Sequence, residues 1–189
     1  MKTYREKLEE AVERFQPDVE EIFDVSLGKI YFRPILPSEK KRFVISIAGT
    51  SPLKYSIPED PGLRKYFAIS YNQNFLFNFK SKNRVNWIAI HEMAHLAHAK
   101  CVGAEDYNRT PIFIAEPVAD YVAYSILGIE VSKFSLFGDI FLRDIRDVVN
   151  ACRVNSLRET LLKEEITIKD YVRDFERYKQ FMSHQNIGF

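Results

Sequence analysis

Two histidines and a glutamate stand close together in an otherwise apolar stretch of the sequence. The stretch runs from Trp87 to Ala97, and His91, Glu92 and His95 are its only ionisable residues. We expect a helix here, and a helix that is apolar on all its other sides is buried. Burying two imidazoles and a carboxylate is costly unless something compensates them. A metal ion would compensate them.

The spacing of these residues specifies the chemistry further. His91 and His95 are four residues apart, so on a helix they project from one face, one turn apart. This arrangement lets two imidazole nitrogens bind one ion at about 2.0–2.1 Å. Glu92 lies roughly 100° round the helix from His91, where it can act as general base on a metal-bound water. The pattern, His-Glu-x-x-His, therefore predicts a catalytic zinc site.

A catalytic zinc ion normally has three protein ligands and a water. His98 lies on the same face as His95, but a straight helix leaves little room for a third ligand there. Cys101 stands where a metzincin carries its third histidine, yet His98 replaces the glycine that metzincins have between the two. Glu116, in the next expected helix, is the third candidate and the one that we favour.

Glu116 has a second explanation, because acidic residues favour helix N-termini in general. Beside His91 and His95, we interpret it as the third metal ligand. Asp120 lies one helical turn further on and faces the same way. Its carboxylate could accept the outer N–H of a ligand histidine, which would fix the tautomer and raise the basicity of that ring.

Residues 86–125 resemble the gluzincins, the thermolysin-like and aminopeptidase-like metallopeptidases whose third ligand is a glutamate on a second helix. The segment Phe113–Tyr121 is similar to the Trp-Leu-x-Glu-Gly-Phe-Ala-x-Tyr segment of the aminopeptidase-like branch. The spacing of Glu116 and Asp120 is similar to that of the thermolysin-like branch. The small size resembles the minimal gluzincins of prokaryotes and the compact metallopeptidases that cleave repressors in stress responses.

This resemblance implies a zinc-dependent metallopeptidase that hydrolyses a peptide or protein substrate. His91, His95 and Glu116 are then the metal ligands, Glu92 is the general base, and Asp120 is the outer partner of a ligand histidine. A regulatory or interaction protein that keeps a zincin core, with little or partner-restricted proteolysis, is the alternative function. A coincidental motif in a structural domain is a third.

The resemblance also bears on three details of the site. Pro117 replaces a glycine of the aminopeptidase-like branch, so we expect the second helix to begin or kink near Glu116. The expected strand 74–80 resembles the edge strand on which such enzymes lay an extended substrate. The residue that stabilises the oxyanion stays open among Tyr107, Arg109, Tyr121, Tyr124 and His184.

The elements around this site change character along the chain. Helical spacing over 3–15 predicts a helix that Pro17 ends, with another turn or two at 18–24. The next part shows period-two alternation and a proline-rich loop at 50–62. We expect strands at 30–32, 42–47, 66–70 and 74–80, with Phe75, Phe77 and Phe79 in the core.

After residue 83 the pattern becomes helical. We expect helices up to Lys100, over 112–127 with an end at Gly128, over 138–152, and over part of 157–183. The predicted fold class is therefore α+β and zincin-like, with a small, mostly antiparallel N-terminal sheet followed by helices. We expect one domain, 1–189, made of a helix and sheet region (1–83), the metal-site helices (84–128) and a helical C-terminal region (129–189).

Composition excludes several other classes. The 189 residues carry 27 basic and 26 acidic side chains, and no basic stripe of the kind that binds nucleic acid is present. The first ten residues lack the apolar region of a secretory signal, and no apolar run reaches the roughly 20 residues of a membrane span. Cys101 and Cys152 form no Cys-x-x-Cys pair. We therefore expect a cytoplasmic protein that binds neither nucleic acid nor a membrane.

Overall fold

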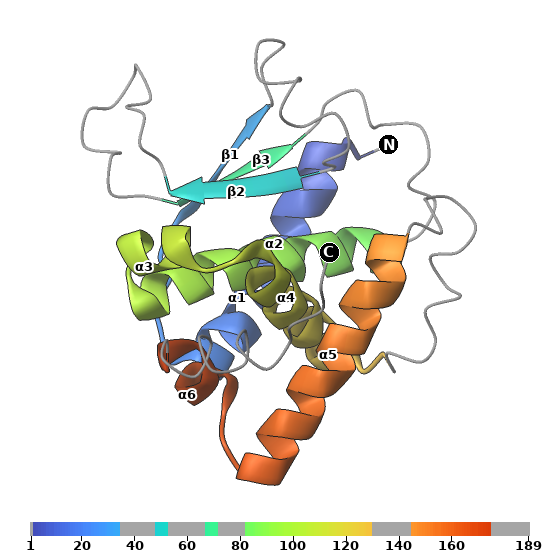
Figure 1. Cartoon of the computed structure of the whole chain (residues 1–189). Helices are drawn as coiled ribbons and strands as arrows, with labels where there is room; N and C mark the ends of the chain where they lie inside the picture. The colour runs from blue at the N-terminus through green and yellow to red at the C-terminus, as the bar shows by residue number, and fades with distance from the viewer. Residues whose placement is uncertain (1, 35–47, 53–66, 72–81, 130–144, 175–189) are drawn as a thin grey trace.

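The computed structural model describes residues 2–34, 48–52, 67–71, 82–129 and 145–174. Within them lie six helices and three strands (Figure 1). The helices are α1 (Tyr4–Phe23), α2 (Lys82–Val102), α3 (Ala104–Arg109), α4 (Ile112–Leu127), α5 (Ile145–Glu164) and α6 (Ile168–Arg173). The strands are β1 (Ile30–Pro34), β2 (Ala48–Pro52) and β3 (Phe67–Tyr71).

Helix α2 lies at the centre of the described structure. It packs against α1, α4, α3, α6 and strand β2, and Figure 1 shows it running across the molecule beneath the sheet. Its apolar residues, among them Ile90, Met93 and Leu96, are almost completely buried. This position explains why the sequence of α2 is apolar on every side, since each face meets another element.

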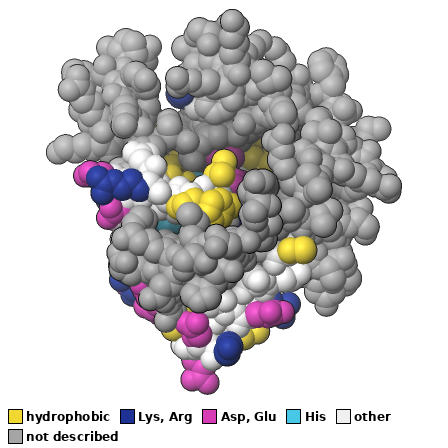
Figure 2. All heavy atoms as spheres, in the orientation of Figure 1, with side chains coloured by type: hydrophobic (Ala, Val, Ile, Leu, Met, Phe, Trp, Pro, Cys, Tyr) yellow, Lys and Arg dark blue, Asp and Glu magenta, His cyan; other side chains and the backbone are white. Residues whose placement is uncertain are grey.

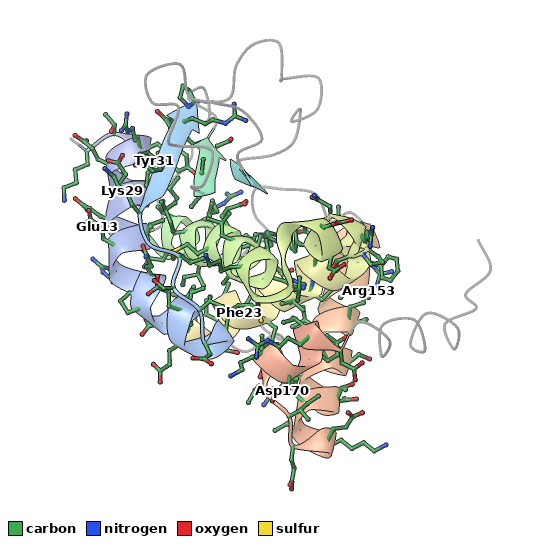
Figure 3. All side chains as sticks on the ribbon, turned by 90° about the vertical axis from the view of Figure 1, so that its left-hand side faces the viewer. Glu13, Phe23, Lys29, Tyr31, Arg153 and Asp170 are labelled. Carbon is green, nitrogen blue, oxygen red and sulfur yellow. The ribbon has the colours of Figure 1, made fainter. Side chains whose placement is uncertain are left out.

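Helix α1 packs against α2 through a single stripe of apolar side chains. A capping box between Thr3 and Glu6 begins the helix, and Asp24 in the left-handed conformation ends it. The stripe includes Leu8 and Phe23, both fully buried. Figure 3 shows Phe23 directed among the helices and Glu13 on the outer side of α1.

The prediction that Pro17 ends the first helix is wrong. Helix α1 continues through Pro17 to Phe23. A proline inside a helix removes one backbone hydrogen bond and clashes with the preceding turn. Beyond Pro17, however, Val19 and Phe23 are both fully buried in the core. Burial of two such side chains yields a few kcal/mol, which is enough to offset the cost of the proline.

The predicted fold class is wrong in its sheet. Helices hold most of the described residues, and the sheet has three strands in the order β1-β3-β2. Strand β1 pairs with β3 in parallel, and β2 pairs with β3 antiparallel. The sheet is therefore small and mixed. A period-two pattern identifies a strand and its faces, but it does not encode which strand is the neighbour or in which direction it runs.

Several predicted elements have different boundaries in the structure. Strand β2 occupies 48–52, which overlaps the start of the predicted loop. Its Pro52 ends the strand at one edge of the sheet that the described residues form, where proline is tolerated. Helix α5 extends to Glu164, past the predicted end at 152, and α6 lies within the predicted helical stretch 157–183. The end of α4 at Gly128 is confirmed. The predicted strands 42–47 and 74–80, with Phe75, Phe77 and Phe79, lie outside the described residues, as does His184.

Among the described residues, no helix combines the length and apolar character that crossing a membrane requires. Figure 2 shows acidic and basic side chains interspersed along the lower part of one face of the molecule.

Candidate metal centre

Helix α2 brings His91 and His95 to the same face, one turn apart. Both side chains are buried, with exposed fractions of 8% and 6%. The indole ring of Trp87, one turn before His91, stacks on the His91 ring with centroids 4.7 Å apart. The two imidazoles therefore have little freedom to turn away from the position that the helix gives them.

Helix α4 supplies the acidic side of the centre. It begins at Ile112, directly after Pro111, and ends with Gly128 in the left-handed conformation. Its buried face, which includes Val118 and Val122, packs on α2. The guanidinium group of Arg153, on α5, lies over the ring of Phe113, and this contact helps to pack α5 against α4 (Arg153 is labelled in Figure 3).

The predicted helix over 112–127 is confirmed, because α4 spans Ile112–Leu127. The expectation that it begins near Glu116 is wrong, and the alternative, a kink there, stays a prediction. Glu116 lies in the second turn of α4, and Pro117 is the sixth residue of the helix. The proline removes the hydrogen bond that its nitrogen would otherwise donate to the carbonyl of Phe113. Pro117 itself is buried. The packing of α4 between α2 and α5 therefore maintains a helix that the sequence alone would interrupt.

The structure brings His91, His95 and Glu116 into one cluster. Nε2 of His91 lies 3.1 Å from Nε2 of His95. The two carboxylate oxygens of Glu116 lie 3.4 Å from these nitrogens, Oε2 from His91 and Oε1 from His95. Each histidine nitrogen thus faces a different oxygen of the same carboxylate, and one ligand atom from each of the three residues lies within 4.8 Å of the other two.

The separations in this cluster are compatible with a bound metal ion. With metal–ligand distances of about 2.0–2.1 Å, the edges of a coordination tetrahedron are about 3.3 Å long. The two histidine nitrogens are 3.1 Å apart, which is close to that length, and each of them has one oxygen of Glu116 at 3.4 Å. Two imidazoles and a carboxylate are also a ligand set that zinc accepts, although iron, cobalt and nickel accept it as well.

Each of the two histidines has an outer hydrogen-bond partner. Nδ1 of His91 donates to Oδ1 of the buried Asp120 over 2.8 Å. An ionised carboxylate only accepts, so the proton of a neutral His91 is on Nδ1 and the lone pair on Nε2 faces the cluster. The hydroxyl of Tyr107 lies 2.8 Å from Nδ1 of His95.

The charges in the cluster attract a cation. Burial lowers the pKa of His91, but hydrogen bonds and charge attraction from Asp120 and Glu116 outweigh burial and raise that pKa well above its ordinary value. Burial raises the pKa of Glu116, but His91 and His95 outweigh this effect and hold it far below its ordinary value. Both directions show that these side chains together favour positive charge at the point where they meet.

Glu92 lies on the same helix and is 7% exposed. Burial raises the pKa of its carboxyl, while the charges of His91 and His95 act in the opposite direction and that of Glu116 raises it further. The carboxyl is therefore near all three ligand residues, although it is not one of the three that converge.

The structure does not bring the other two candidate ligands into the cluster. His98 is fully buried but is not among the residues whose ligand atoms converge, and neither of its ring nitrogens has a hydrogen-bond partner within the described part of the chain. Burial, together with the charge of His95, lowers the pKa of His98 to about 3, so this ring is neutral. Cys101 is a partly exposed free thiol at the end of α2.

The residues considered for the oxyanion are scattered. Tyr107 contacts His95, and Arg109 pairs with Glu105 and Asp106 at the surface. Tyr124 is buried near the ring of Trp87. Tyr121 is partly buried against the core, and His184 lies outside the described residues.

Two contacts of the centre were not predicted from the sequence. One is the stacking of Trp87 on His91, which the i, i+4 spacing could have indicated. The other is the contact of Tyr107 with His95. Tyr107 follows His95 by 12 residues, past the break at Gly103, so no helical spacing relates the two.

No protein-family model, curated protein or solved structure matches this chain. The resemblance of residues 86–125 to the gluzincins is therefore an interpretation of sequence and site geometry alone.

Proposed function

We propose that this protein is a zinc-dependent metallopeptidase. The observation that carries the proposal is the convergence of His91, His95 and Glu116. The two Nε2 atoms lie 3.1 Å apart, each has one carboxylate oxygen of Glu116 at 3.4 Å, and three such residues form the ligand set of a catalytic zinc site. The ligands come from two different helices, α2 and α4, and both histidines are buried. A surface cluster of acidic residues would have neither property.

The residues around the ligand cluster support zinc chemistry in particular. Imidazole and carboxylate ligands with one further position available are typical of catalytic zinc sites. The carboxylate of Asp120 accepts a hydrogen bond of 2.8 Å from Nδ1–H of His91. Such an outer hydrogen bond makes a ligand imidazole more basic and fixes its orientation.

A bound zinc ion would supply Lewis acidity, which makes water nucleophilic at neutral pH and polarises a carbonyl group. The chain supplies the rest. The carboxylate of Glu92 accepts a proton from the attacking water and returns it to the nitrogen of the leaving amine. Asp120 keeps the Nε2 lone pair of His91 directed at the ligand cluster throughout. The two imidazoles are buried, and the helices packed around them limit the access of bulk water.

The test is peptide hydrolysis by wild type and by Glu92→Gln, both loaded with zinc and screened against a peptide library by mass spectrometry. We expect the variant to keep its zinc and to lose about 10²–10⁴-fold in turnover, the usual worth of a general base. Glu13→Gln, at an exposed position on α1, is the matched control and should match wild type. Full activity in Glu92→Gln would refute the assignment of the base. A zinc-loaded wild type that is inert on the whole library would favour the regulatory alternative.

A further inference from the structure

Helix α3 reaches the rest of the molecule mainly through one side chain. The helix has only six residues, Ala104–Arg109. From Glu105 to Arg109, Tyr107 is the one side chain that is partly buried, whereas the others are exposed. The position of α3 on α2 therefore depends on what Tyr107 contacts.

Tyr107 contacts two histidines of α2. Its ring packs edge-on against the ring of the fully buried His98, with centroids 5.1 Å apart and an interplanar angle of 77°. Its hydroxyl lies 2.8 Å from Nδ1 of His95. The ring contact fixes the position and orientation of the phenol. Its hydroxyl therefore lies beside Nδ1 of His95, the nitrogen of this candidate ligand that is not in the ligand cluster.

The other nitrogen of His95 faces the ligand cluster. Nε2 lies 3.1 Å from Nε2 of His91 and 3.4 Å from Oε1 of Glu116. For Nε2 to bind a metal ion it must present its lone pair, so the proton of the neutral ring must be on Nδ1. In that tautomer Nδ1–H donates to the phenol oxygen of Tyr107.

We propose that Tyr107 is a positioning residue that holds His95 in its metal-binding tautomer and thereby docks α3 onto the metal centre. The inference rests on the proposed metal centre and adds a third element, α3, to the two helices that carry the ligands. His95 thus has a neutral phenol as its outer partner, whereas His91 has the carboxylate of Asp120. Because a hydrogen bond to a charged acceptor is stronger, the effect of Tyr107 should be the smaller of the two.

The test compares zinc affinity in wild type, Tyr107→Phe and Tyr31→Phe, by competition with a chromophoric chelator. Tyr107→Phe keeps the ring on His98 and removes only the hydroxyl. We expect it to weaken zinc binding by about tenfold, the lower end of the range for an outer partner of a ligand. Tyr31→Phe makes the same chemical change on β1, where the ring contacts Lys29, and should leave the affinity unchanged. A Tyr107→Phe affinity within twofold of wild type would overturn the inference while leaving the metal centre in place.

A second measurement separates positioning from a structural role. In zinc-loaded wild type, ¹⁵N-edited NMR should show a proton on Nδ1 of His95 that exchanges slowly with water. In Tyr107→Phe that proton should exchange faster, although the melting temperature of the metal-free protein stays within a few degrees of wild type. An unprotected Nδ1 in wild type would overturn the inference. Failure of wild type to bind zinc at all would overturn the metal centre and this inference with it.

Discussion

The histidines of α2 have two kinds of environment, which differ in their polar contacts. One surrounds His91 and His95 in the middle of the helix, and the other surrounds His98, one turn further along. All three are buried, and His98 is the most deeply buried of them. The rings of His91 and His95 have polar contacts at both nitrogens. The ring of His98 has no such contact with the residues that the structure describes, and it packs against the rings of Phe23 and Tyr107.

The comparison shows that burial does not identify a metal-binding histidine. Burial disfavours the charged form of every imidazole on this helix. At His91 the carboxylates of Asp120 and Glu116 reverse that effect, and the pKa rises. At His98 no carboxylate among the described residues does so; burial and the charge of His95 lower its pKa to about 3. The difference between the two parts of α2 therefore comes from α4, which supplies acidic partners to one part and not to the other.

The largest effect among the variants that keep all three ligands should come from removing the acidic partner of His91. Asp120→Asn keeps the shape of the side chain but removes its charge, so the tautomer of His91 is no longer fixed. We expect zinc affinity to fall by up to about 100-fold, the upper end of the range for an outer partner. Chelator competition measures this, and Asp18→Asn, at an exposed position on α1, is the matched control. Unchanged zinc affinity in Asp120→Asn would mean that the acidic partners from α4 are not what distinguishes His91 from His98.

A smaller effect should appear in stability when His98 is replaced. A base whose folded-state pKa lies below its unfolded value, about 3 against 6.5, binds more protons in the unfolded state. Its contribution to stability is therefore lost as the pH falls below about 6.5. His98→Leu removes that loss, and replacing an unpartnered polar ring by an apolar group is close to neutral or stabilising at neutral pH.

We therefore expect the advantage of His98→Leu over wild type to grow by about 1.4 kcal/mol for each pH unit below 6.5. Urea unfolding of the two metal-free proteins at pH 7.5 and 5.5 measures it, because the two proteins share every other titratable group. The same variant should keep its zinc. An advantage that does not change with pH would show that His98 is solvated or partnered in solution.

The helical part of the centre could be predicted from the sequence because it depends on local periodicity. The spacing of His91 and His95 and the turn between Glu116 and Asp120 follow from 3.6 residues per turn, and the structure places all four in or around one cluster. The contact of Tyr107 with His95 could not be predicted in this way, since it depends on how a six-residue helix after Gly103 folds back along α2.

The sheet illustrates the same limit on a larger scale. The positions of β1 and β3 follow from alternation in the sequence, whereas their parallel pairing depends on contacts between strands more than 30 residues apart. The prolines show where tertiary packing overrides local preference. Pro17 and Pro117 both lie inside helices, because buried residues on either side keep α1 and α4 continuous.

The most direct test of the metal centre is the zinc content per chain, by elemental analysis, of untagged wild type and Glu116→Ala purified side by side. Glu105→Ala, at an exposed position on α3, is the control for loss of an acidic side chain. We predict about one zinc per chain in wild type and in Glu105→Ala, as expected for one set of three ligands, and a clear loss in Glu116→Ala. No zinc in wild type, even after reconstitution, or full retention in Glu116→Ala would contradict the account.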